Sequence, residues 1–356
     1  MTAVLPREAA PERARPSTRR GLLSSGWTRG AGLLVAAGVL VALAATSVAV
    51  GSKQIGLGTV WDALWSYDSS QNDHLIIHTL RIPRTVIGLA VGAALGLAGG
   101  VMQGVTRNPL ADPGILGIQA GSSLAVVVAI YVFDVSTLSS YVWFAFLGAA
   151  VASVAVYLLG SMGRGGATPV KLALAGAAMS ALLASFTSTV LLLDVDTLDQ
   201  FRFWVVGSLA GRDAEVAAQV MPFLVAGTLL ALASARSLNT LALGEDVARS
   251  LGQRVQLARA ASALAVVLLC GGATAAAGPI AFIGLTIPHV ARAICGPDHR
   301  WLLPWCLVLG PTLLLSADVL GRIVARPGEL QVGIVTALLG APFFIMLVRR
   351  RKLAEL

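Results

Sequence analysis

Charged residues are scarce in this chain. Only 12% of its 356 residues are Asp, Glu, Lys or Arg, whereas 56% are hydrophobic and the mean hydropathy is +0.80. A soluble domain usually carries about 25% charged residues, and a soluble fold of this length could not bury so much apolar surface. This scarcity excludes an ordinary soluble protein and indicates that lipid surrounds most of the chain.

The chain also lacks the motifs of several enzyme classes. It has no Gly-x-x-x-x-Gly-Lys-[Ser/Thr] loop for ATP phosphates and no His-Glu-x-x-His zinc motif. Its four His residues do not cluster with Cys or carboxylates at metal-ligand spacing. Cys270, Cys295 and Cys306 are interpreted as small membrane-buried hydrophobic residues. We therefore expect no catalytic, metal or cofactor site in this chain.

Uncharged stretches supply the length that membrane helices need. A spanning helix takes about 20 mostly apolar residues, and all but one of these stretches fit a single helix. The exception, 260–291, is broken by Gly and Pro and predicts two helices joined by a tight turn. We expect an all-α polytopic membrane protein with about ten transmembrane helices. The stretches are 30–50, 85–106, 113–133, 135–163, 172–193, 216–235, 260–291, 301–317 and 330–348.

Positive charge sets the expected orientation. With a cytoplasmic N-terminus and ten spans, most of the 26 Lys and Arg residues fall inside, as the positive-inside rule requires. The net charge of +8 is then a sign of topology rather than of nucleic-acid binding, and both termini are cytoplasmic. Residues 1–29 are expected to be a disordered basic cytoplasmic tail, and 30–352 a single transmembrane domain. The basic residues left outside are Lys53, Arg81, Arg84, Arg202, Arg212, Arg322 and Arg326.

The second expected helix, 84–106, has a glycine at every fourth position. Residues four apart lie on one helix face, so this ladder forms a groove in which another backbone can approach closely. Gly costs about 1 kcal/mol relative to Ala inside a helix, which indicates a packing role. The helix-packing residues are Gly88, Gly92, Gly96, Gly100 and Gly104.

Two Gly/Pro breaks interrupt the apolar runs. The first, at 107–114, contains Asn108, Pro109 and Pro113 and follows the ladder at the expected cytoplasmic end. The second spans 278–288. Paired breaks in the two halves predict an inverted internal repeat, in which the second to fifth helices correspond to the seventh to tenth.

Segment 237–256 is the most charged interior stretch and is cytoplasmic in this topology. Leu243, Val247 and Leu251 are four residues apart, so they form one apolar stripe on a short helix with charged residues beside it. A solvated loop does not need such a stripe. A surface that docks another protein does.

Ordered blocks of sequence resemble the membrane subunits of iron–siderophore and vitamin B12 importers, the FecCD-type permeases of ABC transporters. Examples are Leu-Arg-Ile-Pro-Arg at 80–84, Asn-Pro-Leu-Ala-Asp-Pro-Gly at 108–114 and Gly-Pro-Ile-Ala-Phe-Ile-Gly-Leu at 278–285. The resemblance covers about 55 to 352, and further blocks lie at 99–103, 241–252, 287–289, 298–300 and 333–344.

The resemblance implies a type II ABC importer permease. Two permease subunits, the same or homologous, would work with two cytoplasmic ATPase subunits and an extracytoplasmic substrate-binding protein. ATP and Mg would be bound by the ATPase partner, and this chain would be no enzyme. The expected substrate is an iron–siderophore complex, with vitamin B12 or haem as the alternative. The expected location is the cytoplasmic (inner) membrane.

The resemblance also implies roles for particular residues. ATPase coupling is expected of Leu241, Leu243, Gly244, Glu245, Val247, Ala248, Arg249, Leu251 and Gly252. Docking of the binding protein is expected of Arg81, Arg84 and Arg322. The cytoplasmic gate and helix breaks are expected at Asn108, Pro109, Asp112, Pro113, Thr168 and Pro288.

A secondary transporter is the alternative class. Coupling to protons or sodium usually needs ionisable residues inside the membrane. The hydropathy pattern places Asp112 and Asp318 near helix ends and no carboxylate in mid-span. This favours an energy source outside the chain, in an ATPase partner.

Overall fold

The computed structural model describes residues 21–162 and 168–349, and every regular element in these ranges is helical. Three apolar helices are short: α5 (Ile118–Phe133), α13 (Ile283–Cys295) and α15 (Val332–Arg349). Together with the long helices they match the ten that the uncharged stretches predict. The seven helices long and apolar enough to cross a membrane include α1 (Gly26–Ala49), α4 (Ile82–Thr106), α6 (Leu138–Ser161), α7 (Pro169–Leu193), α9 (Ala214–Ala233), α12 (Val255–Ala277) and α14 (His299–Val324).

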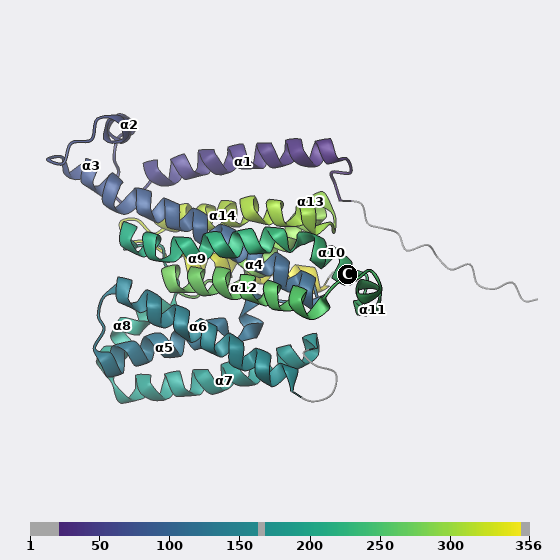
Figure 1. The fold of residues 1–356 in the computed structure, drawn as a ribbon. Coiled ribbons are helices and arrows are strands. Elements are labelled where there is room, and N and C mark those ends of the chain that lie inside the picture. Colours follow the sequence, from purple (N-terminus) through teal and green to yellow (C-terminus); the bar gives the residue numbers. More distant parts are fainter. Residues whose placement is uncertain (1–20, 163–167, 350–356) are drawn as a thin grey trace, which may run out of the picture.

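The long helices lie side by side in one bundle, with short helices gathered at its two ends (Figure 1). The α2 end carries α2 (Leu57–Trp65), α3 (Asn72–Ile76) and α8 (Val195–Val205). A π-helical turn, η1 (Ile77–Arg81), leads from α3 into α4. The opposite end, which we call the α11 end, carries α10 (Ala235–Ala242) and α11 (Glu245–Ser250).

Residues 21–29, which were expected to belong to a disordered tail, have a defined structure. Residues 1–20 lie outside the described residues, but the backbone N–H groups of Leu22 and Leu23 donate to two carbonyls in the last turn of α13, at 3.0 and 2.9 Å. Carbonyls at a helix end have no partner in their own helix, so this segment caps α13. A capping box then starts α1 at Gly26 instead of residue 30.

Helix α4 forms the centre of the bundle. Its most apolar window is 78% buried, against 6% for α1 and 11% for α7. α4 packs against α9, α12, α13 and α14. α1 and α7 therefore leave most of their apolar surface for lipid or for another chain.

All five glycines of the ladder face α14. A Cβ added at Gly96 would lie 2.7 Å from the carbonyl oxygen of Cys306, and Gly92 packs directly on Gly310 and Pro311. The backbone of α14 fills the middle of the groove on α4, where Gly310 faces Gly92 and Gly96. Side chains of α14 fill the groove on either side of this crossing.

The first Gly/Pro break carries the chain back into the bundle. α4 ends where Arg107 adopts a left-handed conformation with φ of 50°. Pro113 then packs beside Gly284, which also faces the carbonyl of Leu95: a Cβ added at Gly284 would lie 3.0 Å from Pro113 Cδ and 3.2 Å from that oxygen. Leu95 is near the middle of α4. α5 therefore begins at Ile118 inside the bundle, and its 16 residues span only about 24 Å.

This path corrects the expected position of one carboxylate, Asp112. Asp112 precedes Pro113 and so lies beside the middle of α4, where its Oδ1 accepts a hydrogen bond from the Gly114 N–H at 2.8 Å. Asp318 lies within α14 and is fully buried. Hydropathy placed Asp112 at a helix end because it could not reveal a segment that folds back. Asp318 is near the end of α14 as expected, but its burial among partners from elsewhere in the chain was not predicted.

Candidate functional site

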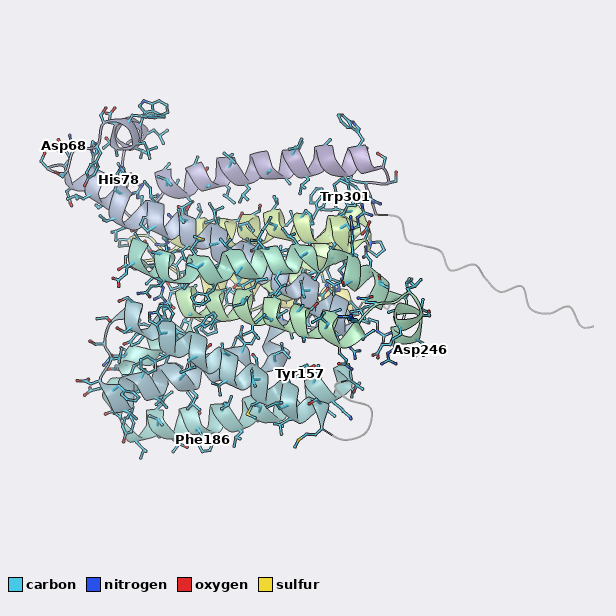
Figure 2. The ribbon with its side chains drawn as sticks, in the orientation of Figure 1. Asp68, His78, Tyr157, Phe186, Asp246 and Trp301 are labelled. Carbon is cyan, nitrogen blue, oxygen red and sulfur yellow. The ribbon has the colours of Figure 1, made fainter. Side chains whose placement is uncertain are left out.

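A knob formed by α10 and α11 protrudes at the α11 end, and Figure 2 shows Asp246 at its edge. Gly244 makes the turn between the two helices with φ of 105°, and Gly252 follows α11 with φ of 81°. Residues with a side chain rarely adopt these values. Both glycines are therefore required by the shape of the knob.

The apolar stripe of the knob faces outward. Leu243, Val247 and Leu251 are 62%, 45% and 64% exposed. Only Val247 lies within α11, because the Gly244 turn leaves Leu243 at the end of α10 and Leu251 follows α11, so the single helical stripe that the spacing predicted is corrected. All three side chains are nevertheless exposed on the knob, and exposed apolar patches of this kind mark interaction surfaces. The stripe is the part of segment 237–256 that is free to meet another protein.

Two of the expected coupling residues face the other way. Leu241 and Ala248 are buried with Val255 in a small apolar cluster, against which Ala258 also packs. They fasten the knob to the start of α12. Their side chains are already covered by the chain itself, so a part in coupling would consist of holding the knob in place, and their coupling role stays a prediction.

A polar clamp holds α10 against α14. The Asn239 side chain donates to Asp298 Oδ1 at 2.6 Å and accepts from the His299 backbone N–H at 2.9 Å. The sequence showed Asp298 and His299 only as one block of the family resemblance. Asn239 was missed, since its partners are about 60 residues away along the chain.

Glu245 ties α11 to the bundle electrostatically. Its carboxylate pairs with Arg249 on the same helix at 3.3 Å and, through its other oxygen, with Arg259 on α12. The Arg249 side chain is 57% exposed, whereas that of Arg259 is 10% exposed. The pair with Arg259 is therefore the less screened of the two.

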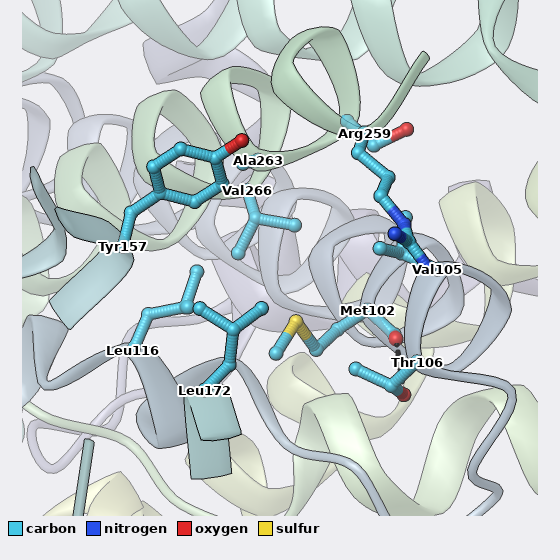
Figure 3. Close-up of a pocket in the computed structure, with 10 residues that line it drawn as sticks. Met102, Val105, Thr106, Leu116, Tyr157, Leu172, Arg259, Ala263 and Val266 are labelled. Carbon is cyan, nitrogen blue, oxygen red and sulfur yellow. Dashed lines mark hydrogen bonds between the residues drawn. The ribbon is translucent and has the colours of Figure 1, made fainter. Parts of the chain in front are cut away.

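A small pocket opens beside Arg259 between α4, α6, α7 and α12. Figure 3 shows Arg259 and Tyr157 reaching toward it, with Leu116 and Leu172 below. Its volume of about 30 Å³ admits one or two water molecules. A chelate of the size of a siderophore is far larger than this space, so the pocket itself does not hold such a substrate.

The two helix breaks meet, whereas the other expected gate residues have local roles. Pro113 contacts Gly284, which lies four residues before Pro288. Asn108 Oδ1 accepts from a backbone N–H two residues on, at 2.9 Å. Thr168 caps α7 by accepting from a backbone N–H at 3.4 Å. A gating role for these residues stays a prediction.

At the α2 end, the expected docking arginines are buried. Arg81, Arg84 and Arg322 are 5%, 9% and 1% exposed. Arg84 forms a bidentate pair with Asp318, with Nη2 2.8 Å from Oδ1, and a second pair with Glu329 at 2.6 Å.

The other two arginines also have partners within the chain. Arg322 pairs with Asp318 at 2.5 Å and donates to the Ser47 carbonyl at 2.8 Å. Arg81 donates to two carbonyls in the last turn of α1 and to the Lys53 carbonyl beyond it, at 2.6 to 3.0 Å. The view of these side chains as free surface charges is corrected: their first role is to join α1, α4 and α14.

A cavity of about 170 Å³ nevertheless reaches this arginine cluster from the surface. Its wall includes all three arginines together with Lys53 and Glu329. The Glu329 side chain is 26% exposed, whereas Asp318 is fully buried. Glu329 is thus the acidic partner that solvent can reach.

Known proteins are similar to this chain over most of its length. The ferric enterobactin transport system permease protein FepD of Escherichia coli is 47% identical over 88% of this chain and 93% of the relative. The probable siderophore transport system permease protein YfiZ of Bacillus subtilis is 41% identical over 88% and 93%. The hemin transport system permease protein HmuU of Yersinia pestis is 36% identical over 88% and 94%.

A solved structure shares the fold. It is described as an inward-facing conformation of a metal-chelate type ABC transporter, and it matches with a TM-score of 0.78 at 28% identity, over 90% of this chain and 99% of that one. The model of the FecCD transport family matches residues 39–350. The chain is a multi-pass membrane protein and belongs to the FecCD transport family.

Proposed function

We propose that this chain is the membrane-spanning permease of an ATP-driven importer that carries an iron–siderophore complex across the cytoplasmic membrane. The observation that carries the proposal is the 47% identity to a permease named for ferric enterobactin transport. That identity extends over nearly the whole of both chains, so it includes the bundle, the breaks and the knob. Relatives named for other siderophores support the same substrate class.

The knob supports an ATPase partner at the α11 end. Its stripe is apolar and exposed, and its fastening to α12 and α14 would let it transmit force. In the proposed assembly two ATPase subunits bind ATP and Mg, and two permease subunits, the same or homologous, form the pathway. The α11 end and both termini are then cytoplasmic, in agreement with the positive-inside rule.

The α2 end would receive the substrate-binding protein. Arg84 is the arginine best placed to take part, because one of its two acidic partners, Glu329, is accessible from the surface cavity. A carboxylate brought by a binding protein would compete with Glu329 for the Arg84 guanidinium. Arg81 and Arg322 would support this contact from within by holding the helices together.

Haem is the second candidate substrate. It is favoured by the hemin permease relative, which is 36% identical to this chain. Haem and ferric siderophores are both iron chelates, so the fold does not discriminate between them.

Reconstitution tests the proposal. The complete transporter, with its second permease, ATPase and binding-protein subunits, is placed in liposomes and offered ferric enterobactin, a ferric hydroxamate, ferric citrate, haemin and vitamin B12. We expect uptake of a ferric siderophore that requires internal ATP. If only haemin or only vitamin B12 is taken up, the iron–siderophore assignment is wrong and that compound is the substrate. Uptake driven by a proton or sodium gradient without ATP would overturn the importer class.

A further inference from the structure

One buried side chain connects the knob to the four helices around the small pocket. Arg259 is the fifth residue of α12, and its guanidinium reaches the carboxylate of Glu245 in the first turn of α11. The same side chain lines the pocket that α4, α6 and α7 close with Thr106, Tyr157 and Leu172. Arg259 therefore contacts both the knob and the junction of helices at the α11 end.

We propose that Arg259 is a positioning residue for transport, whose ion pair with Glu245 links movement of the knob to opening of the helices around this pocket. The proposal rests on the proposed function, because it assumes an ATPase docked on the knob. It assigns a role to a residue outside segment 237–256, which was expected to contain the coupling residues.

The other attachments of the knob act elsewhere. The apolar cluster joins it to the start of α12, and Asn239 joins α10 to α14. Neither contacts the pocket. The Arg249 pair lies within α11 and is exposed, so it contributes little to holding α11 in place. Among the described contacts, the Arg259 pair alone links α11 to a residue of the pocket wall.

The chemistry suits a rigid link. A guanidinium is a planar donor that stays charged, and it holds a carboxylate in a fixed direction. With a side chain 10% exposed, Arg259 is poorly screened by salt, so a shift of Glu245 is resisted or followed by α12. The pocket holds only about 30 Å³, so a displacement of Arg259 must move the side chains that pack around it.

A charge-reversal series tests the link in the reconstituted transporter. The measured quantity is the number of ferric chelate molecules imported per ATP hydrolysed, with ferric enterobactin as the probe or the chelate of the panel that gave uptake. Glu245→Gln and Arg259→Gln are each expected to lower this ratio about tenfold, the size of a typical coupling effect. The double variant Glu245→Arg/Arg259→Glu is expected to recover at least part of that loss.

Controls separate this role from mere stability. Arg202→Gln removes an exposed pair with Asp199 at the α2 end and should leave the ratio unchanged. Arg259→Lys keeps the positive charge. It should import more chelate per ATP hydrolysed than Arg259→Gln does, even if both variants assemble in smaller amounts. Single variants that import normally per ATP, or a double variant no better than either single one, would overturn the proposal. An unmutated transporter without ATP-dependent uptake would instead overturn the proposed function.

Discussion

Gly99 of α4 lies directly against the carbonyl oxygen of Gly284 in the first turn of α13. A proline in α13 explains why another helix can approach this oxygen so closely. Pro288 is four residues further on and has no N–H, so the Gly284 carbonyl lacks its usual partner within the helix. α4 and α13 therefore meet at the second break with no side chain between them.

A methyl group at this contact should destabilise the protein. In Gly99→Ala the new Cβ would overlap backbone atoms of Gly284, which cannot rotate away, and overpacking costs about 1–3 kcal/mol. Gly100→Ala is the matched control, since its Cβ would lie 3.0 Å from the mobile end of Leu303. We expect a clearly lower melting temperature in detergent for Gly99→Ala only. Equal melting temperatures for the two variants would contradict the contact.

Neutralising Asp318 should be more damaging than neutralising an exposed carboxylate. Asp318→Asn leaves Arg84 and Arg322 without their shared buried partner, and breaking a buried pair costs about 3–5 kcal/mol. Asp73→Asn removes an exposed pair with Lys53, worth about 0–1 kcal/mol. Thermal unfolding and the yield of folded protein measure the difference. Similar behaviour of both variants would show that the arginine cluster does not stabilise the bundle.

The outer pair of the cluster should respond to acid. Partial burial raises the pKa of Glu329, but the hydrogen bond and charge of Arg84 outweigh it, so the pKa lies below its ordinary 4.5. A lowered pKa stabilises the fold above pH 4.5, and that contribution is lost as the pH falls through the folded-state value. Glu329→Gln should therefore melt below wild type at pH 7, and the gap should close below pH 4.5. A gap that persists in acid would rule out the ionised pair as its cause.

Hydropathy and spacing predicted the helices and one packing face of this fold. Each uncharged stretch corresponds to one helix, or to two in the case of 260–291. The reason is that lipid requires apolar side chains and a backbone whose hydrogen bonds are satisfied internally. The glycine ladder indicated a close approach but not its partner, since Gly310 and Pro311 occur in α14 without a ladder of their own. Which helix fills a groove depends on tertiary packing.

Contacts between residues far apart in the chain could not be predicted from local sequence patterns. Arg84 and Asp318 are 234 positions apart, and either side chain alone resembles a charge at a membrane surface. The path that brings Pro113 beside Leu95 depends on the room left by Gly284, which no local pattern reveals. The exposed apolar residues of the knob were identifiable from their spacing, which is a local property, but the turn at Gly244 that separates Leu243 from α11 was not predicted.

The exposed stripe gives the last prediction, which concerns docking at the α11 end. Val247→Asp and Leu251→Asp place charges where we propose an apolar contact with the ATPase subunit, and burying an unpaired charge at an interface is costly. Both variants should insert normally, since these side chains already face solvent. Leu198→Asp on α8, 41% exposed at the α2 end, is the control. We expect the ATPase subunit to co-purify with the control but to be lost at least tenfold from the stripe variants, about 1.4 kcal/mol or more of binding free energy. Full retention by Val247→Asp and Leu251→Asp would show that the ATPase binds another surface.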